Sequence, residues 1–210
     1  MKLLLTSTGL THPEITKSLL DLLGKSPNQT KIGFVPVAAI TDDEKLYVEE
    51  SKIELSKLGI KEIIDIINFS KSDREICQSL DALYVCGGNT FHLMNEINKS
   101  NFGEVIKEFI AADKPYIGVS AGTIIVTPSI EIASVEPADD NSVGLKNFAG
   151  LGIIDFEISP HVPETVPYEN VQKYSANRKV KLFAISDQTA IKIQNGNLEI
   201  IGEKKFKIFN

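Results

Sequence analysis

The sequence is poor in the residues that form metal sites and covalent cross-links. Its 210 residues contain three histidines, two cysteines and no tryptophan. So few histidines argue against a metal site built from several of them, and Cys77 and Cys86 lack the spacing of zinc ligands. We expect no metal, and two reduced thiols that take no part in a functional site.

Positive charge is also scarce. The chain has 22 basic and 28 acidic residues and a net charge of −6, which disfavours attraction to phosphate backbones and anionic lipids. No apolar run approaches the roughly 18 residues of a membrane-spanning helix, and the first residues are too short for a signal-peptide core. We therefore expect a cytoplasmic protein that binds neither nucleic acid nor membrane. With 42% hydrophobic and 24% charged residues, the composition is that of a folded protein with a sizeable core.

The order of the apolar segments predicts an α/β fold. Short apolar runs alternate with segments of helical periodicity, which is typical of a mostly parallel central sheet flanked by helices. The carboxyl ends of its strands should form one functional edge. The expected strands are Lys2–Thr6, Lys31–Pro36, Glu62–Ile66, Ala82–Cys86 and Tyr116–Val119. The expected helices are Pro13–Leu23, Asp43–Leu58, Arg74–Leu80, Thr90–Asn98 and Phe102–Ala112, with Thr41 and Ser72 as N-caps.

After about residue 128 the pattern changes to further strands. These are expected at Ile130–Ala133, Ile153–Ile158, Leu182–Ile185, Ala190–Ile193, Leu198–Ile201 and Phe206–Phe209. The turn at Asn195-Gly196 predicts a hairpin in this C-terminal part. No linker or internal repeat divides the chain, so we expect a single domain over residues 1–210.

A Gly-x-Ser-x-Gly segment follows the expected strand Tyr116–Val119. In Gly118–Gly122 the serine is Ser120, and an apolar stretch comes next. A strand that runs through such a turn into a helix is typical of a nucleophile elbow, where small flanking residues allow a tight turn and lift the hydroxyl above the sheet edge. The alternative is a structural strand-to-helix turn.

A second loop, Cys86–Asn89, contains Gly87 and Gly88 and precedes an expected helix. Glycines before a helix expose backbone N–H groups, which suits an anion or a developing oxyanion. The alternative is a plain tight turn in which Asn89 is the N-cap. No Gly-Lys-Ser/Thr sequence follows, so the loop is not a P-loop.

A serine nucleophile needs a base, and the chain offers only His12, His92 and His161. His161 follows an expected strand in a proline-bracketed loop, which makes it the leading candidate. His92 falls inside a helix, where capping or exposure is the simpler interpretation. His12 follows the first strand and could border the site, although a bystander role is favoured.

The partner of the histidine should be a carboxylate that orients the ring. Asp187 lies in a short turn between two expected strands, where an aspartate is commonly only a turn former. Spacing alone therefore leaves several rivals, which are Asp155, Glu157 and Glu164.

Four segments together resemble the peptidase E family of serine peptidases. They are Cys86–Phe91 (CGGNTF), Gly118–Gly122 (GVSAG), Ser159–His161 (SPH) and Ser186–Gln188 (SDQ), in that order along nearly the whole chain. The resemblance implies a sheet like that of class I glutamine amidotransferases, which carry cysteine at the elbow. It also implies a Ser-His-acid catalytic set without metal or cofactor, acting on a small peptide.

Carried over position by position, the resemblance implies a nucleophile at Ser120, a general base at His161 and an acid at Asp187, where the aspartyl dipeptidases are expected to have glutamate. The N–H groups of Gly88 and Ala121 become the oxyanion hole.

Other serine hydrolases fit the same segments less well. α/β-Hydrolases run in the order serine, acid, histidine, and would need one of Glu131, Glu136, Asp139 or Asp140 as the acid. Cyanophycinases, which are related isopeptidases, also need an acid in that interval. A non-catalytic protein that binds a small anion at the glycine loop is the alternative of a different class.

Substrate selection is where the chain departs from the family. Asp-X dipeptidases are expected to bind the substrate carboxylate with a basic residue shortly after the elbow, but this chain has Glu131 there. Asn89 and Glu131 are the candidate substrate-binding residues. Arg178 could supply a positive charge, although we expect it at a solvated helix end.

Overall fold

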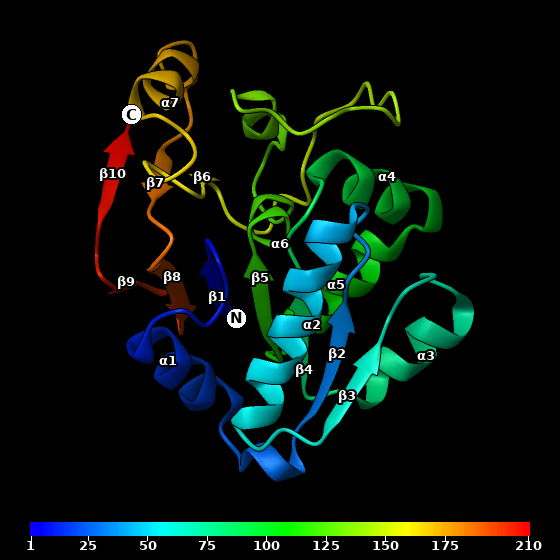
Figure 1. Ribbon diagram of the computed structural model, residues 1–210. Helices are drawn as coiled ribbons and strands as arrows, with labels where there is room; N and C mark the ends of the chain where they lie inside the picture. Colours follow the sequence, from blue (N-terminus) through cyan, green and yellow to red (C-terminus); the bar gives the residue numbers. More distant parts are fainter.

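A computed structural model describes the whole chain, residues 1–210 (Figure 1). The strands are β1 Lys2–Thr6, β2 Lys31–Val35, β3 Glu62–Asp65, β4 Ala82–Val85, β5 Pro115–Val119, β6 Glu157–Ser159, β7 Leu182–Ile185, β8 Thr189–Gln194, β9 Asn197–Gly202 and β10 Phe206–Phe209. The α-helices are α1 Pro13–Leu23, α2 Asp42–Lys57, α3 Lys71–Ser79, α4 Thr90–Ser100, α5 Phe102–Ala111, α6 Ala121–Ile124 and α7 Tyr168–Ser175. Two 3-10 helices occur at Pro27–Gln29 and Glu131–Ser134.

The central sheet has seven strands in the order β3-β2-β4-β5-β1-β8-β9. The first five are parallel to one another, and β8 and β9 are antiparallel additions at one edge. The hairpin between β8 and β9 turns at Asn195-Gly196, where both residues have positive φ, as a type I′ turn requires. The predicted α/β class, parallel core and C-terminal hairpin are confirmed.

The apolar strands of this sheet are buried on both faces. Successive side chains of β1 point to opposite sides, so that Leu3 and Leu5 join one hydrophobic cluster and Leu4 joins the other. Helices α1 and α2 cover the side of Leu4, and Figure 1 shows both in front of the sheet. Helices α3, α4 and α5 pack into the other cluster. This layering explains why the strands read as continuous apolar runs.

A smaller sheet lies beside the central one, with the order β10-β7-β6. Strands β6 and β7 are parallel, and β10 pairs antiparallel with β7. The loops that leave β6 and β7 carry His161 and Asp187. The small sheet therefore positions two of the three residues of the expected catalytic set.

Three details of the sequence interpretation are corrected. The apolar run Ile130–Ala133 forms no strand, because local bonds such as Ala133 N to Ile130 O close the 3-10 turn of Glu131–Ser134. Only the end of Ile153–Ile158 enters a strand, since the amides of its first two residues donate to Val126 O after α6. Helix α3 begins at Lys71 rather than Arg74, and Ser70, not Ser72, accepts the capping bond from Asp73 N.

Candidate active site

Main-chain packing shapes the turn at Ser120. A Cβ at Gly118 would lie 2.6 Å from Gly122 O, and a Cβ at Gly122 would lie 2.2 Å from Val85 O. Only glycine fits at these two positions, and Ser120 itself adopts a strained backbone with φ 47° and ψ −106°. The turn therefore has the geometry of a nucleophile elbow, with the serine between β5 and α6.

The glycine loop lies directly against this elbow. A Cβ at Gly87 would come within 3.1 Å of Ser120 Cβ, and a Cβ at Gly88 would lie 2.3 Å from Ala38 O. The positive φ of Gly88, 129°, is a second reason for glycine there. The Gly88 amide donates to no acceptor of the chain, and Gly88 and Ser120 line the same cavity. The Ala121 amide directly follows Ser120 and opens α6, where an N–H has no acceptor within its own helix.

His161 follows β6 in a left-handed backbone conformation, with φ 61°. Its carbonyl accepts bonds from Thr165 N and Val166 N, which close a turn and hold the loop. Its Nε2 lies 2.8 Å from Ser120 Oγ. With the ring proton on Nδ1, Nε2 is the acceptor for the serine hydroxyl.

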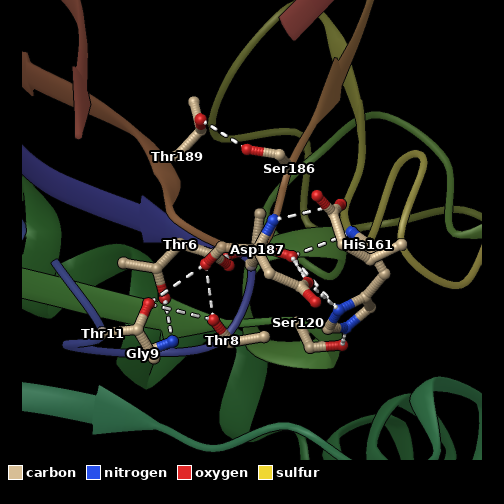
Figure 2. Close-up of polar contacts among 12 residues, drawn as sticks. Thr6, Thr8, Gly9, Thr11, Ser120, His161, Ser186, Asp187 and Thr189 are labelled. Atoms are coloured by element: carbon tan, nitrogen blue, oxygen red, sulfur yellow. Dashed lines mark hydrogen bonds and ion pairs between the residues drawn. The ribbon is translucent and has the colours of Figure 1, made fainter. Parts of the chain in front are cut away.

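Asp187 occupies the turn between β7 and β8, on the other side of the histidine. Its Oδ1 lies 2.7 Å from His161 Nδ1 (Figure 2). Burial opposes its ionisation, but hydrogen bonds from His161 and Ser7 outweigh that effect and lower the pKa of the Asp187 carboxyl below its ordinary value. A serine, a histidine and an ionised aspartate thus lie in one hydrogen-bonded chain.

The loop after β1 supplies contacts that the sequence interpretation missed. Ser7 Oγ donates to Asp187 Oδ1 at 3.0 Å and accepts from His161 N at 2.8 Å. The hydroxyls of Thr8 and Thr11 both donate to the Asp187 carbonyl, at 2.5 Å and 3.1 Å. A polar residue directly after the first strand was the only available signal, and it is a weak one. Figure 2 shows Thr8 and Thr11 on the same side of Asp187.

The two candidate substrate-binding residues have other partners. Asn89 caps α4, where its Oδ1 accepts from His92 N, and its Nδ2 donates to Asp140 O. Glu131 pairs with Arg178, which also pairs with Glu157. Neither Asn89 nor Glu131 lines the cavity at Ser120. Arg178 is not at a solvated helix end, because it lies in a turn beyond α7 and joins two carboxylates.

The other two histidines and the rival acids form no hydrogen bond with the His161 ring. His12 caps α1 by accepting from Glu14 N, and His92 lies within α4. Glu157 is buried against Arg178 and Tyr174. Glu164 pairs with Lys205, and Asp155 is exposed. Of the four acids considered for the α/β-hydrolase order, which are Glu131, Glu136, Asp139 and Asp140, only Asp139 lines the cavity, and it accepts a bond from Thr90 N at 2.8 Å.

The cavity at Ser120 has a volume of about 580 Å³ and a distinctive charge. No lysine or arginine lines it, whereas five carboxylates do: Glu44, Glu50, Glu54, Asp139 and Asp187. Burial, and secondarily Glu50, raises the pKa of the Glu54 carboxyl, and burial with a smaller contribution from Glu44 raises that of Asp139 despite the bonds from Thr90. The cavity is therefore an acidic environment with His161 as its single basic group.

No three side chains of histidine, cysteine, aspartate or glutamate converge in a way that could hold a metal ion. No helix has both the length and the apolar character that crossing a membrane requires.

Known proteins are similar to this chain in sequence and in fold. The model of peptidase family S51 matches residues 3–201. An uncharacterized peptidase of Listeria monocytogenes is 35% identical over 188 residues, which are 87% of this chain and 88% of the relative. Peptidase E of a Nostoc species is 27% identical and is matched over 92% of this chain and 80% of its own. The crystal structure of a Listeria monocytogenes protein provisionally assigned as peptidase E has a TM-score of 0.79 at 27% identity, covering 96% of this chain and 98% of that one.

Proposed function

The chain belongs to peptidase family S51, and from that premise we propose that it hydrolyses small peptides with Ser120 as nucleophile, His161 as general base and Asp187 as the orienting acid. The observation that carries the proposal is the pair of short contacts on either side of the imidazole, 2.8 Å to Ser120 Oγ and 2.7 Å to Asp187 Oδ1. The order serine, histidine, aspartate supports this set over the α/β-hydrolase arrangement.

The reaction then follows from the positions of these atoms. His161 Nε2 takes the hydroxyl proton as Ser120 Oγ attacks the peptide carbonyl carbon, and the carbonyl oxygen becomes an oxyanion. The amides of Gly88 and Ala121 donate to that oxyanion. The tetrahedral intermediate collapses when His161 returns the proton to the departing amine, which leaves an acyl group on Ser120. Water attacks the acyl-enzyme in the same way and releases the free acid.

Asp187 has an electrostatic part in each step. Its carboxylate accepts a hydrogen bond from Nδ1–H, which fixes the tautomer in which Nε2 can act as a base. It also stabilises the imidazolium that forms when Nε2 is protonated. Because its pKa is lowered, it remains ionised at neutral pH.

The size and charge of the cavity support a substrate class. About 580 Å³ is within the range of cavities that bind small molecules, which favours a short peptide. Five carboxylates and no lysine or arginine offer nothing to pair with an acidic side chain. We therefore infer a preference for peptides with neutral or basic residues, rather than the Asp-X preference of aspartyl dipeptidases.

Replacing the nucleophile tests the reaction. Ser120→Ala should abolish peptide hydrolysis and labelling by a fluorophosphonate probe, while circular dichroism shows an unchanged fold. If a folded wild-type protein is neither labelled nor active on any peptide, the chain is a binding protein that uses the glycine loop. If Ser120→Ala hydrolyses the best peptide at the wild-type rate, the proposed nucleophile is wrong.

A dipeptide panel tests the substrate class separately. Rates for Lys-X and Ala-X should exceed the rate for Asp-X by about tenfold or more, because a carboxylate is repelled by the cavity. Asp139→Asn keeps an acceptor for Thr90 N and should narrow the ratio between Lys-X and Asp-X. Fastest cleavage of Asp-X would contradict the inference, and exclusive cleavage of side-chain-linked peptides would indicate a cyanophycinase-like isopeptidase.

A further inference from the structure

Ser7 lies at the centre of the candidate site because of the sheet order. Strand β1 lies between β5, which leads to Ser120, and β8, which follows Asp187. Thr6 is paired with Val119 in β5 and with Ala190 in β8. The residue after Thr6 therefore emerges between the nucleophile and the acid, at the edge of the sheet where their side chains meet.

The contacts of the Ser7 hydroxyl use its full hydrogen-bonding capacity in a defined direction. Its single proton is directed to Asp187 Oδ1 at 3.0 Å, and its lone pairs face His161 N at 2.8 Å and His161 Nδ1 at 3.2 Å. The side chain is fully buried, so water does not replace these partners. One hydroxyl thus joins the backbone of the base to the carboxylate of the acid.

This connection acts on two features that the reaction needs. His161 has a positive φ of 61°, and the bond from its amide to Ser7 Oγ helps to hold that uncommon conformation. The bond to Oδ1 fixes the same carboxylate oxygen that accepts the Nδ1 proton. Thr8 and Thr11 hold the Asp187 carbonyl from the same loop, so the β1 loop restrains both ends of this residue.

We propose that Ser7, which borders the cavity but is fully buried behind its partners, is a positioning residue that sets the distance and orientation between His161 and Asp187. The proposal rests on the proposed function, since a positioning residue requires the Ser-His-Asp reaction. It goes beyond that function by assigning a fourth side chain, from the loop after β1 and far from the other three in sequence, to the same hydrogen-bonded unit.

The test is a kinetic comparison of Ser7→Ala with the wild-type protein on the best dipeptide. We expect kcat to fall by about 10- to 100-fold, the range for losing a hydrogen bond to a charged group, while KM changes less than about twofold. Ser175→Ala is the matched control, because Ser175 is also buried but its hydroxyl donates to Gln172 O within α7. This control should keep the wild-type kcat.

Two further variants separate positioning from a general structural role. In the Asp187→Ala background, Ser7→Ala should lower kcat by no more than about twofold, because residues that act as one unit are not additive. Ser7→Cys keeps the volume but supplies a weak donor, and it should also lose kcat, which provides a test if the alanine variant is poorly folded. Thermal unfolding is measured for every variant.

The outcomes distinguish the two proposals. The positioning role would be overturned if folded Ser7→Ala kept the wild-type kcat. It would also be overturned if the fold-losses in kcat of Ser7→Ala and Asp187→Ala multiplied in the double variant. If Ser120→Ala is inactive in the same series, the proposed function stands despite that result. An active Ser120→Ala variant overturns both.

Discussion

Ser120 is placed by main-chain packing, whereas His161 and Asp187 are placed by side-chain hydrogen bonds. Around the serine, glycine positions touch the backbone of neighbouring segments, and the turn is buried on the sheet side. The histidine and aspartate side chains are 28% and 31% exposed, and their geometry depends on hydrogen bonds among the loops that follow β1, β6 and β7. The nucleophile half of the site, which is Ser120 with its glycine neighbours, should therefore lose stability and activity together when a side chain crowds it. The base half, which is His161 and Asp187 with their hydrogen-bond partners, should lose activity in steps as single bonds are removed.

Asp187→Asn should have the largest effect, and that effect is on the rate of catalysis. The change removes the charge that fixes the Nδ1 proton, so we expect kcat to fall by about 10³- to 10⁴-fold. Asp155→Asn is the matched control, because Asp155 is exposed and should keep wild-type kcat. Steady-state kinetics of both variants test this prediction. Equal losses of kcat in the two variants would show that Asp187 has no special role.

The same variant has a defined effect on stability as the pH changes. Because the folded-state pKa of Asp187 is lowered, its ionised form stabilises the protein above the unfolded-state value of about 4, and that contribution is lost as the pH falls through the folded-state pKa. The difference in free energy of unfolding between wild type and Asp187→Asn should shrink as the pH falls below about 4. Urea unfolding at several pH values measures it, and a difference that grows toward acid would contradict the sign.

Gly122→Ala should break the nucleophile half, and here stability and activity should fail together. The new Cβ would lie 2.2 Å from Val85 O, a main-chain atom that cannot move alone. We expect the free energy of unfolding to drop by about 3 kcal/mol, with loss of fluorophosphonate labelling. Gly24→Ala is the control, since no atom lies within 4 Å of its Cβ position and only its positive φ opposes alanine, by about 1 kcal/mol. A Gly122→Ala protein of normal stability and activity would show that the elbow can relax.

Arg178→Met should weaken the base half through its support. Glu157 is fully buried in β6, and Arg178 neutralises it while stacking on Tyr174. Methionine would leave that carboxylate uncompensated, so we expect a loss of about 2 kcal/mol in the free energy of unfolding, allowing for the partial exposure of Arg178. The double variant Arg178→Met/Glu157→Gln should recover part of the loss. No recovery in urea unfolding would mean that the ion pair is not the cause.

The difference between the nucleophile half and the base half also explains which site residues could be predicted from the sequence. Gly118 and Gly122 flank the serine because main-chain contacts exclude any side chain, and such steric demands leave a fixed spacing in the sequence. Ser7 leaves no comparable mark, since a serine after a strand is common and only the position of β1 between β5 and β8 gives it a role. Spacing alone likewise leaves Asp187 and Glu164 open, and only the family resemblance favours Asp187, because a local pattern does not show which carboxylate reaches the ring. Arg178 pairs with Glu131 across 47 positions, which no local pattern predicts.

The smallest effect on activity is expected from alkylation of the two cysteines. This experiment tests whether Ser120 is the only nucleophile at the cavity. Cys86 borders the cavity and Cys77 lies in α3, both are buried, and burial raises the pKa of the Cys77 thiol to about 11 and that of Cys86 further. Raised pKa values keep both groups as unreactive thiols at pH 8. Iodoacetamide should therefore leave peptide hydrolysis unchanged in the folded protein, whereas a fluorophosphonate that reacts with Ser120 should abolish it. Rapid inactivation by iodoacetamide that is prevented in a Cys86→Ala variant would show that the cavity holds a second nucleophile. It would also show that reagents reach the nucleophile half more easily than its packing indicates.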